Sequence, residues 1–495
     1  MGGEEIEANS IFTLLHSLLF GRSNPMKTFS CILLLITGLT VSLPASERPN
    51  MVLVFIDDMG WGDFSCFGNT EANTPHIDAM AEEGLRFHQF YVNSPICSPS
   101  RVAISTGQYP QRWRITSYLA RRAMNEERGV ANWLDPKAPM LARILNEAGY
   151  ATGHFGKWHM GGQRDVDDAP PITAYGFDAS LTNFEGMGAK LLPLTEKPLE
   201  NGEIEKGRIW EDAERLGAPV EWTLRSEITG GFVERAIGFI NAAQEDDKPF
   251  YINLWPDDVH TPLFPKVENW SDSKRGLYLA VLEEMDAQLA PLFNRIKTDE
   301  KLRNNTIVLI CSDNGPELDY GSGGPFKGLK ATLFEAGVRS PLVVWAPGLM
   351  AESVRGTIND DSLVCAMDLV PSLLKVAEIR PPEGVTFDGV ELANTFLGKS
   401  KRSRPDPIFF RRPPDRKDFR NLKELPDLAM RQGKWKLLCD YDSGRPMLYD
   451  LESDPGETNN LASRYPERVG RMNQAIMKWN ALMPKDGGDP GRSGN

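Results

Sequence analysis

The sequence predicts an α/β fold, with a large, mostly parallel (mixed) sheet sandwiched by helices. A smaller C-terminal subdomain is expected to follow, built on a short antiparallel sheet and a helix. Short apolar runs of strand length recur along the chain, at residues 51–56, 151–155, 250–254, 306–310 and 341–345. Amphipathic segments with helical spacing lie between them. Strands that alternate with helices are typical of a parallel sheet covered on both faces.

Three helices have clear boundaries in the sequence. The first opens with Thr74 as a possible cap and Pro75 in its first turn, and it ends at Gly84. The second covers residues 139–148 and ends before Gly149. Residues 277–296 carry apolar side chains at helical spacing and predict the longest helix of the chain.

The domain organisation follows from changes in composition. A basic, loop-like segment at residues 398–405 separates a large N-terminal domain, residues 47–400, from the C-terminal subdomain, residues 405–485. Within the subdomain, residues 435–439 and 447–451 predict an antiparallel strand pair. Residues 486–495 are rich in Gly, Asp and Pro and predict a flexible tail. Residues 163–225 contain few strand or helix signals, so we expect long loops around a site there.

The N-terminus has the pattern of an export signal. Met26-Lys27 precede an apolar run at residues 29–41, and Ser42-Leu43-Pro44-Ala45 offers a cleavage site. We therefore interpret residues 1–25 as an upstream extension and residues 26–45 as a signal peptide. The run is too short to span a bilayer comfortably, and no later segment is long and apolar enough. We expect a periplasmic or secreted protein without a stable membrane anchor.

The net charge of −13 argues against general nucleic-acid binding and predicts that any anion site is built locally from a few cationic side chains. The chain has six cysteines, one of them, Cys31, inside the expected signal peptide. Their spacing shows neither a CxxC motif nor a zinc pattern.

Polar residues follow four of the predicted strands directly or after a short turn. They are Asp57 and Asp58, Lys157 and His159, His260 after Asp257 and Asp258, and Asp313 and Asn314. Because ligands of open α/β sheets bind at the carboxyl ends of the strands, we expect these side chains to meet at one edge. Acidic pairs there would repel each other without a cation, and their hard oxygen ligands favour calcium or magnesium, with calcium fitting somewhat better.

The segment Cys97-Ser98-Pro99-Ser100-Arg101 resembles the Cys-x-Pro-x-Arg signature of the type I sulfatases, arylsulfatase-like members of the alkaline phosphatase superfamily. Other segments resemble further motifs of that family in the same order: 57–63, 156–159, 260–262, 313–315 and 324–328, with a matching C-terminal pattern at 433–436 and 448–451. The resemblance covers nearly the whole chain after residue 50. One position departs from it: Gln108 stands where the family often has arginine.

The resemblance implies that a formylglycine-generating enzyme oxidises Cys97 to formylglycine, and that the protein is a sulfuric ester hydrolase. A hydrated aldehyde carries two hydroxyls on one carbon. One attacks sulfur and expels the alcohol; the other then loses its proton, so that the aldehyde re-forms and sulfate leaves. A difficult hydrolysis is thereby divided into two easier steps.

The resemblance also implies roles for single residues. Asp57, Asp58, Asp313 and Asn314 would hold one Ca²⁺ together with the modified Cys97, and Arg101 would orient that side chain and offset charge. Lys157 and Lys327 would bind the sulfate oxygens. His159 is the expected base for the second hydroxyl, and His260 is the expected acid that protonates the leaving alcohol and contacts the substrate.

The substrate follows less directly from the sequence. Arg112, Arg114, Arg121, Arg122 and Trp133 come after the cysteine motif and suggest a sulfated carbohydrate, an anionic polysaccharide fragment. A solvated helix surface explains these arginines equally well. Two other functions remain open: a phosphate- or phosphonate-ester hydrolase of the same superfamily, and a non-catalytic binder of sulfated glycans in which Cys97 stays a thiol.

Overall fold

A computed structural model describes residues 47–489. The expected extension at residues 1–25 and signal peptide at residues 26–45 lie outside the described residues. Within the described part of the chain, no helix is long and apolar enough to cross a membrane.

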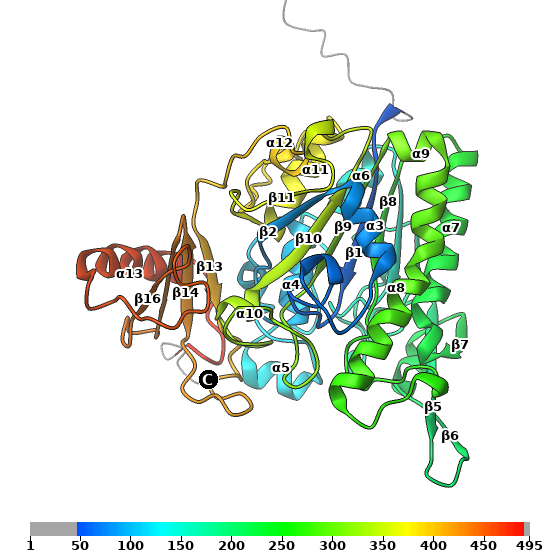
Figure 1. The fold of residues 1–495 in the computed structure, drawn as a ribbon, viewed down its shortest axis with the longest axis horizontal. Coiled ribbons are helices and arrows are strands. Elements are labelled where there is room, and N and C mark those ends of the chain that lie inside the picture. The colour runs from blue at the N-terminus through cyan, green and yellow to red at the C-terminus, as the bar shows by residue number, and fades with distance from the viewer. Residues whose placement is uncertain (1–46, 490–495) are drawn as a thin grey trace, which may run out of the picture. The chain divides into compact units, whose positions relative to one another are not determined.

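The predicted large sheet is present and mostly parallel (Figure 1). Its strands are β1 Asn50–Ile56, β2 Leu85–Tyr91, β3 Ala151–Gly156, β4 Ala179–Leu181, β8 Phe250–Trp255, β9 Thr306–Ser312, β10 Arg339–Trp345, β11 Thr357–Asn359 and β12 Val364–Cys365. They lie in the order β11-β2-β10-β9-β1-β8-β3-β4, with β12 paired to β2. β10 runs antiparallel to both of its neighbours, which makes the sheet mixed, as expected.

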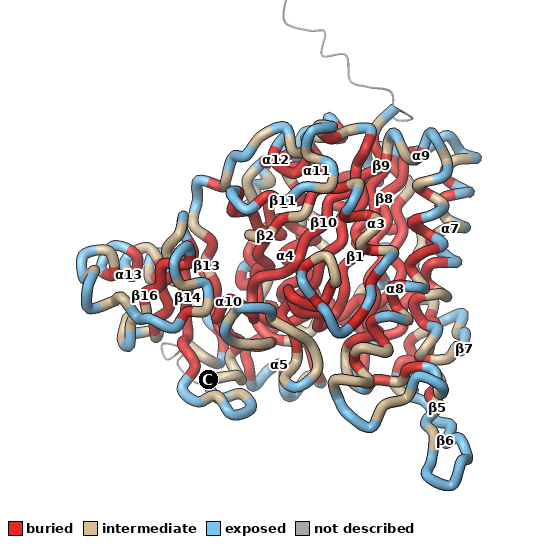
Figure 2. The backbone as a smooth tube through the Cα atoms, viewed as in Figure 1, coloured by how far each residue is buried: buried red, intermediate tan, exposed pale blue. Residues whose placement is uncertain are grey.

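Helices cover both faces of this sheet, because its central strands are apolar on both sides. The helices are α3 Pro75–Glu83, α4 Cys97–Thr106, α5 Arg122–Arg128, α6 Leu141–Glu147, α7 Ile228–Glu245, α8 Lys274–Thr298, α9 Glu300–Asn304, α10 Glu335–Val338, α11 Leu369–Val376 and α12 Ala393–Phe396. Alternate residues of β1 point to opposite cores: Met51 belongs to the core that includes residues of α4, α6 and α11, whereas Val52 belongs to the core that includes residues of α3, α7 and α8. Figure 2 shows the buried sheet between helices with exposed outer sides.

The predicted helix boundaries hold to within a few residues, and α8 is the longest helix described. Thr74 occupies the cap position of α3 but makes no capping hydrogen bond to the helix. Asp286 of α8 replaces it and accepts from the backbone N–H groups of His76 and Ile77 at 3.0 and 2.8 Å. A side chain from a packed neighbour thus satisfies the free amides of the first turn.

The expectation of long loops at residues 163–225 is wrong in part. β5 Lys190–Pro198, β6 Ile204–Arg208 and β7 Val220–Leu224 form a three-stranded sheet in the order β6-β5-β7. β6 is exposed along its whole length and β5 contains prolines, so neither shows the apolar alternation on which strand prediction depends.

The C-terminal subdomain is a four-stranded antiparallel sheet with one helix, which confirms the predicted type and extends it by two strands. Its elements are β13 Ile408–Arg411, β14 Leu428–Gln432, β15 Trp435–Cys439, β16 Met447–Asp450 and α13 Pro466–Ala481. The subdomain shares a hydrophobic core with Tyr91 and Phe334 of the large domain. Of the expected flexible tail, Asp486 is buried 3.6 Å from Arg411, and Gly487 N–H donates to the Arg128 carbonyl.

Candidate active site

The polar residues singled out in the sequence follow four neighbouring strands of the sheet. β9, β1, β8 and β3 are consecutive in the sheet and run parallel, so the segments that follow them lie at one edge. Asp57 follows β1, Lys157 follows β3, and Asp313 follows β9; His260 lies five residues after the end of β8. The structure therefore brings these segments together as the strand pattern predicted.

Three buried carboxylates form the centre of the site. Asp57, Asp58 and Asp313 offer oxygen atoms that all lie within 4.8 Å of one another. The Asp58 backbone N–H donates to Asp313 Oδ1 at 3.1 Å, and Asn314 Nδ2 donates to Asp58 Oδ1 at 2.8 Å. Asn314 Oδ1 is buried without a hydrogen-bond partner. An unpartnered amide oxygen beside three carboxylates is the donor set that a hard divalent cation takes.

Three cationic side chains surround the carboxylates. Arg101 is fully buried in α4; its Nη2 lies 3.0 Å from Asp57 Oδ1 and 2.8 Å from Asp313 Oδ2. Lys157 pairs with Asp57, and Lys330 pairs with Asp58. Arg101 Nη1 also donates to the Lys157 carbonyl at 3.0 Å, which fixes the start of the loop after β3.

Burial and the neighbouring charges move the pKa values of Asp57 and Asp313 in opposite directions. Although burial favours its protonated form, Lys157, His260 and Arg101 hold the pKa of Asp57 well below its ordinary value. Burial and then the negative charge of Asp57 raise the pKa of Asp313 well above its ordinary value. Without a further cation the cluster therefore favours a protonated Asp313, so the residues present fit a bound calcium ion.

Cys97 is the first residue of α4, a helix whose ten residues are all buried. Its side chain opens into the cavity described below, where the helix N-terminus favours an anion. Burial raises the pKa of the Cys97 thiol to about 12, against the opposing effect of Lys157. An unmodified Cys97 is therefore a neutral thiol and a weak nucleophile.

A cavity of about 280 Å³ lies over Cys97. His159, His260 and Lys330 line it beside Cys97. The rest of its lining is Ile96, Tyr118, Arg164, Phe184, Glu317, Ala331, Arg416, Phe419 and Arg420. The cavity thus combines the reactive residues with aromatic and basic side chains.

The two histidines differ in their free ring atoms. His260 Nδ1 lies 2.6 Å from the Thr261 carbonyl, which can only accept, so Nδ1 carries a hydrogen and Nε2 is left to exchange a proton. His260 Nε2 lies 3.5 Å from Asp58 Oδ2. His159 Nδ1 is buried without a partner, while its Nε2 lies 3.4 Å from the Leu119 carbonyl. Burial and the charge of Lys157 lower the pKa of both imidazoles, which favours their neutral forms.

Lys327, expected to bind sulfate, lies outside this cluster. Its Nζ lies 3.3 Å from the Glu457 carbonyl and 4.3 Å from the centroid of the Phe334 ring. Lys330, three residues further along the same loop, occupies the expected position: it is buried, lines the cavity and contacts Asp58. The geometry therefore favours Lys330 over Lys327.

The arginines proposed from the sequence as substrate ligands also lie elsewhere. Arg112 forms a two-point ion pair with Asp388, at 2.7 and 2.6 Å. Arg122 pairs with Asp168 and lies over the Trp133 ring, 5.8 Å from its centroid. Arg114 donates to the Gly129 carbonyl. Arg121 directly precedes α5.

Sequence reasoning missed several residues of the cavity. Tyr118, Arg164 and Phe184 come from loops near the strand ends, whereas Arg416 and Arg420 come from the C-terminal subdomain, more than 300 residues after Cys97. The sequence also provided no sign of Glu185, which is buried, with its Oε1 3.2 Å from Arg164 and 3.8 Å from His159. No local motif marks these positions, because the tertiary fold alone brings them together.

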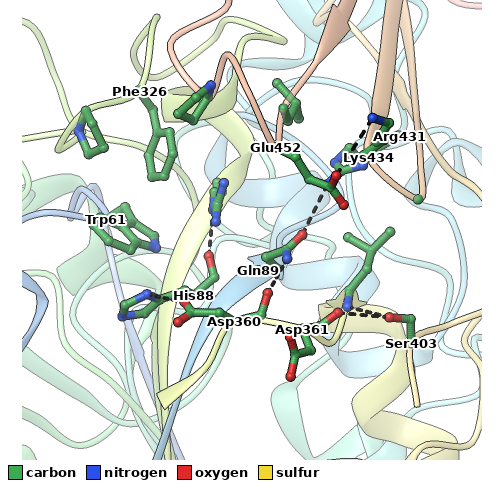
Figure 3. A pocket seen from close by; sticks show the side chains of 16 residues that line it. Trp61, His88, Gln89, Phe326, Asp360, Asp361, Ser403, Arg431, Lys434 and Glu452 are labelled. Atoms are coloured by element: carbon green, nitrogen blue, oxygen red, sulfur yellow. Dashed lines mark hydrogen bonds and ion pairs between the residues drawn. The ribbon is translucent and has the colours of Figure 1, made fainter. Parts of the chain in front are cut away.

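A second cavity, of about 490 Å³, lies between the large sheet and the C-terminal sheet (Figure 3). Several of its polar side chains contact one another: Arg431 donates to Gln89 at 3.1 Å, and His88 lies 2.7 Å from Asp360. Its lining includes neither Cys97 nor any of the central carboxylates. The reactive groups therefore gather at the smaller cavity.

The sulfatase family model matches residues 49–379, and a model of the C-terminal part of N-sulphoglucosamine sulphohydrolase matches residues 327–480. The chain belongs to the sulfatase family, and its activity is sulfuric ester hydrolysis.

Among curated relatives, the chain is 31% identical to human arylsulfatase A over 486 residues, covering 92% of this chain and 90% of the relative. It is 32% identical to N-acetylgalactosamine-6-sulfatase of Canis lupus familiaris over 378 residues, 74% of this chain and 69% of that protein. It is 28% identical to N-acetylgalactosamine-6-O-sulfatase of Bacteroides thetaiotaomicron, and the match covers 87% of this chain and 93% of that protein.

Solved structures resemble this chain over most of its length. Ps i-CgsB superposes with a TM-score of 0.70 at 25% identity, covering 87% of this chain and 92% of that one. A sulfatase structure from work on glycosaminoglycan metabolism by Bacteroides thetaiotaomicron gives a TM-score of 0.69 at 25% identity. The match covers 88% of this chain and 99% of that one. The likeness confirms the predicted fold class.

Proposed function

We propose that the protein releases sulfate from a sulfated carbohydrate, using formylglycine made from Cys97 and one calcium ion. The observation that carries this proposal is the position of Cys97, at the start of α4, in a cavity shared with His159, His260 and Lys330. The names of the curated relatives, which include two N-acetylgalactosamine sulfatases, support a sugar substrate.

The calcium site would consist of Asp57, Asp58, Asp313 and Asn314. A bound calcium ion would supply positive charge against the oxygens of the sulfate group. Arg101 holds the Asp57 and Asp313 carboxylates from behind, through hydrogen bonds to both. It therefore positions metal ligands, and it is not among the residues that line the cavity.

The geminal hydroxyls of a hydrated formylglycine at position 97 would supply the nucleophile and the route by which sulfate leaves. Lys157 and Lys330 extend towards the central carboxylates from two different loops, so their ammonium groups can bind sulfate oxygens as the ester enters. His260, at the cavity wall, already carries a hydrogen on Nδ1, so it would first take up a proton at Nε2 and then pass that proton to the leaving alcohol. His159, with an unpartnered Nδ1, would accept the proton of the second hydroxyl.

The test has two parts. The protein is purified from a host that matures sulfatases, and the mass of the peptide around Cys97 is measured; conversion replaces sulfur with oxygen and removes two hydrogens. Turnover is then compared on the sulfate and phosphate esters of one aryl alcohol and on N-acetylgalactosamine 6-sulfate. We expect the lighter peptide and a preference for sulfate. A larger kcat/KM on the phosphate ester favours the phosphatase alternative, and an unconverted thiol with no turnover favours the glycan-binding alternative.

A further inference from the structure

The loop between β13 and β14, residues 412–427, reaches the cavity over Cys97 from the C-terminal subdomain. Arg416, Phe419 and Arg420 of this loop line the cavity. Asp415 anchors the loop to the large domain, because it accepts from Ser117 Oγ at 2.8 Å and lies 3.0 Å from Arg128 of α5. In Figure 1 this loop, coloured orange, lies beside α5. One wall of the cavity therefore belongs to the smaller subdomain.

The cations around this wall exceed the carboxylates available to them. Asp415 is shared between Arg416, at 2.7 Å, and Arg128, at 3.0 Å. Glu317 lies 3.8 Å from Arg420 and 3.3 Å from Lys330, which also pairs with Asp58. In a protein with a net charge of −13, positive charge left over at one cavity indicates an anionic ligand.

Aromatic rings flank both guanidinium groups, and Nη1 of Arg416 also donates to Asp415. The Arg416 guanidinium lies 5.2 Å from the centroid of the Tyr118 ring and 5.3 Å from that of Phe419. The Arg420 guanidinium lies 5.4 Å from the Phe419 centroid, and its side chain is 48% exposed. A guanidinium stacked on a ring can still offer two N–H groups side by side to a carboxylate or sulfate.

We propose that Arg416 and Arg420 form a second anion-binding subsite next to the sulfate that is cleaved. The substrate would be a saccharide that carries a second oxyanion, a carboxylate or another sulfate, on the sulfated ring or on the adjoining ring. This inference rests on the proposed function. In this inference, the loop of the C-terminal subdomain recognises the second oxyanion of the substrate. The arginines near α5, which the sequence suggested, do not.

The experiment measures kcat/KM of the matured enzyme on four esters: an aryl sulfate, a neutral monosulfated sugar, the same sugar with a second sulfate, and the monosulfated sugar linked to a uronate. Arg420→Gln, Arg416→Gln and the double variant are compared with the parent. The matched control is Arg471→Gln, an arginine of the same subdomain on α13 with 67% of its side chain exposed.

We expect kcat/KM on the two substrates with a second oxyanion to fall at least about tenfold in the double variant, mainly through KM, as for the loss of a charge-assisted contact. On the aryl sulfate and the neutral sugar the fall should stay below about threefold. Arg420→Lys, which keeps the charge without the paired donors, should give an intermediate value. Comparison of the disulfated and uronate substrates shows which oxyanion the subsite prefers.

Equal losses on all four esters, or a parent enzyme that prefers the neutral sugar, would overturn the inference while leaving the proposed function intact. Thermal melting identifies any variant that fails to fold. If the double variant fails to fold, the comparison is made with Arg420→Gln alone, because that position is half-exposed. If the matured parent hydrolyses no sulfate ester, the proposed function fails. In that case the affinity of the disulfated sugar for the parent and for the double variant is measured by calorimetry, which tests the subsite without any turnover. Equal affinities would overturn the subsite.

Discussion

Lys327 and Lys330 lie in one loop but in opposite surroundings. Lys330 is buried beside Asp58 and lines the cavity over Cys97, whereas Lys327 lies against the Phe334 ring and the Glu457 carbonyl. A charge at the cavity can stabilise the negative oxygens of a reacting sulfate; a charge at the subdomain contact cannot.

Lys330→Ala should therefore lower kcat on an aryl sulfate by about a hundredfold or more, the usual effect of removing a charged group that acts on the transition state. Lys327→Ala, the matched control from the same loop, should stay within about threefold of the parent. Steady-state kinetics on matured protein measure both. If the two variants lose activity equally, the assignment of the sulfate contact to Lys330 is wrong.

Most of the candidate site could be predicted at the residue scale, because its members directly follow strands that turn out to be neighbours. Asp57, Lys157 and Asp313 needed only the strand pattern and the rule that parallel strands end at one edge. The choice between Lys327 and Lys330 could not be made in this way. Both belong to a loop without regular structure, so neither spacing nor periodicity distinguishes the side chain that points to the site.

At the scale of elements, a buried ionic cluster joins α10 of the large domain to the C-terminal sheet. Lys436 of β15 lies 3.0 Å from Glu335 of α10 and 3.0 Å from Glu457, and all three side chains are fully buried or nearly so. Although burial acts in the opposite direction, Lys436 and two arginines hold the pKa of Glu335 at about 2. Burial and the charge of Glu335 raise the pKa of Glu457 to about 7.

The raised pKa of Glu457 makes stability depend on pH. Between its ordinary value of 4.5 and about 7, the unfolded chain has given up this proton while the folded protein keeps it, so stability falls as pH rises through that range. Glu457→Gln removes this contribution. The Tm of the variant minus the Tm of the parent should therefore increase from pH 5 to pH 8.

Scanning calorimetry at several pH values measures this difference. Glu467→Gln, on the exposed face of α13, is the matched control and should show no trend. A pH-independent difference for Glu457→Gln would mean that Glu457 is ionised throughout.

Lys436→Met tests the same cluster from its cationic side. It leaves two buried carboxyl groups without their shared partner, and breaking a buried pair in this way costs about 3–5 kcal/mol. We expect a clear loss of Tm and, because the subdomain supplies one wall of the cavity, weaker binding of substrate. An unchanged Tm would show that the cluster contributes little to subdomain docking.

Prediction of elements worked where patterns were strong and failed where they were weak. The five buried strands and the helices α3, α6 and α8 have apolar periodicity and clear boundaries. β6 is exposed along its length and so has no apolar pattern. Likewise, α7 contains Gly230 and Gly231 in its first turn, residues that sequence rules associate with loops.

For the whole molecule, the calcium ion that we propose would tie together segments that follow β1 and β9. An ion that binds only the folded state stabilises it by about 2.7 kcal/mol when present at a hundred times its Kd. Removal of calcium with a chelator should therefore lower Tm, by about 2 °C or more, and added Ca²⁺ should restore it more fully than Mg²⁺.

Asp313→Asn should abolish this response, because it removes one of the three central carboxylates. Asp319→Asn, at a position with 58% of its side chain exposed shortly after the same strand, should keep it. Thermal melting with and without Ca²⁺ is the measurement. If neither the chelator nor Ca²⁺ changes the Tm of the parent protein, the proposed metal site is contradicted independently of any activity assay.

The overall α/β architecture and the antiparallel C-terminal sheet followed from the sequence, but the contact between them did not. Residues 412–427 approach Cys97 through long-range packing, and Asp415 meets Ser117 across 298 positions of sequence. No periodicity or motif encodes such a contact, so the sequence points to arginines between residues 112 and 122 and gives no sign of Arg416 and Arg420.

The burial of α4 has a consequence for the order of events during biosynthesis. Cys97 is 2% exposed, and every residue of its helix is inside the protein. A cavity of about 280 Å³ admits a sugar but not the active site of another enzyme. Any enzyme that oxidises this cysteine must therefore act while the chain is still open, and a molecule that completes folding first is committed to remain a thiol.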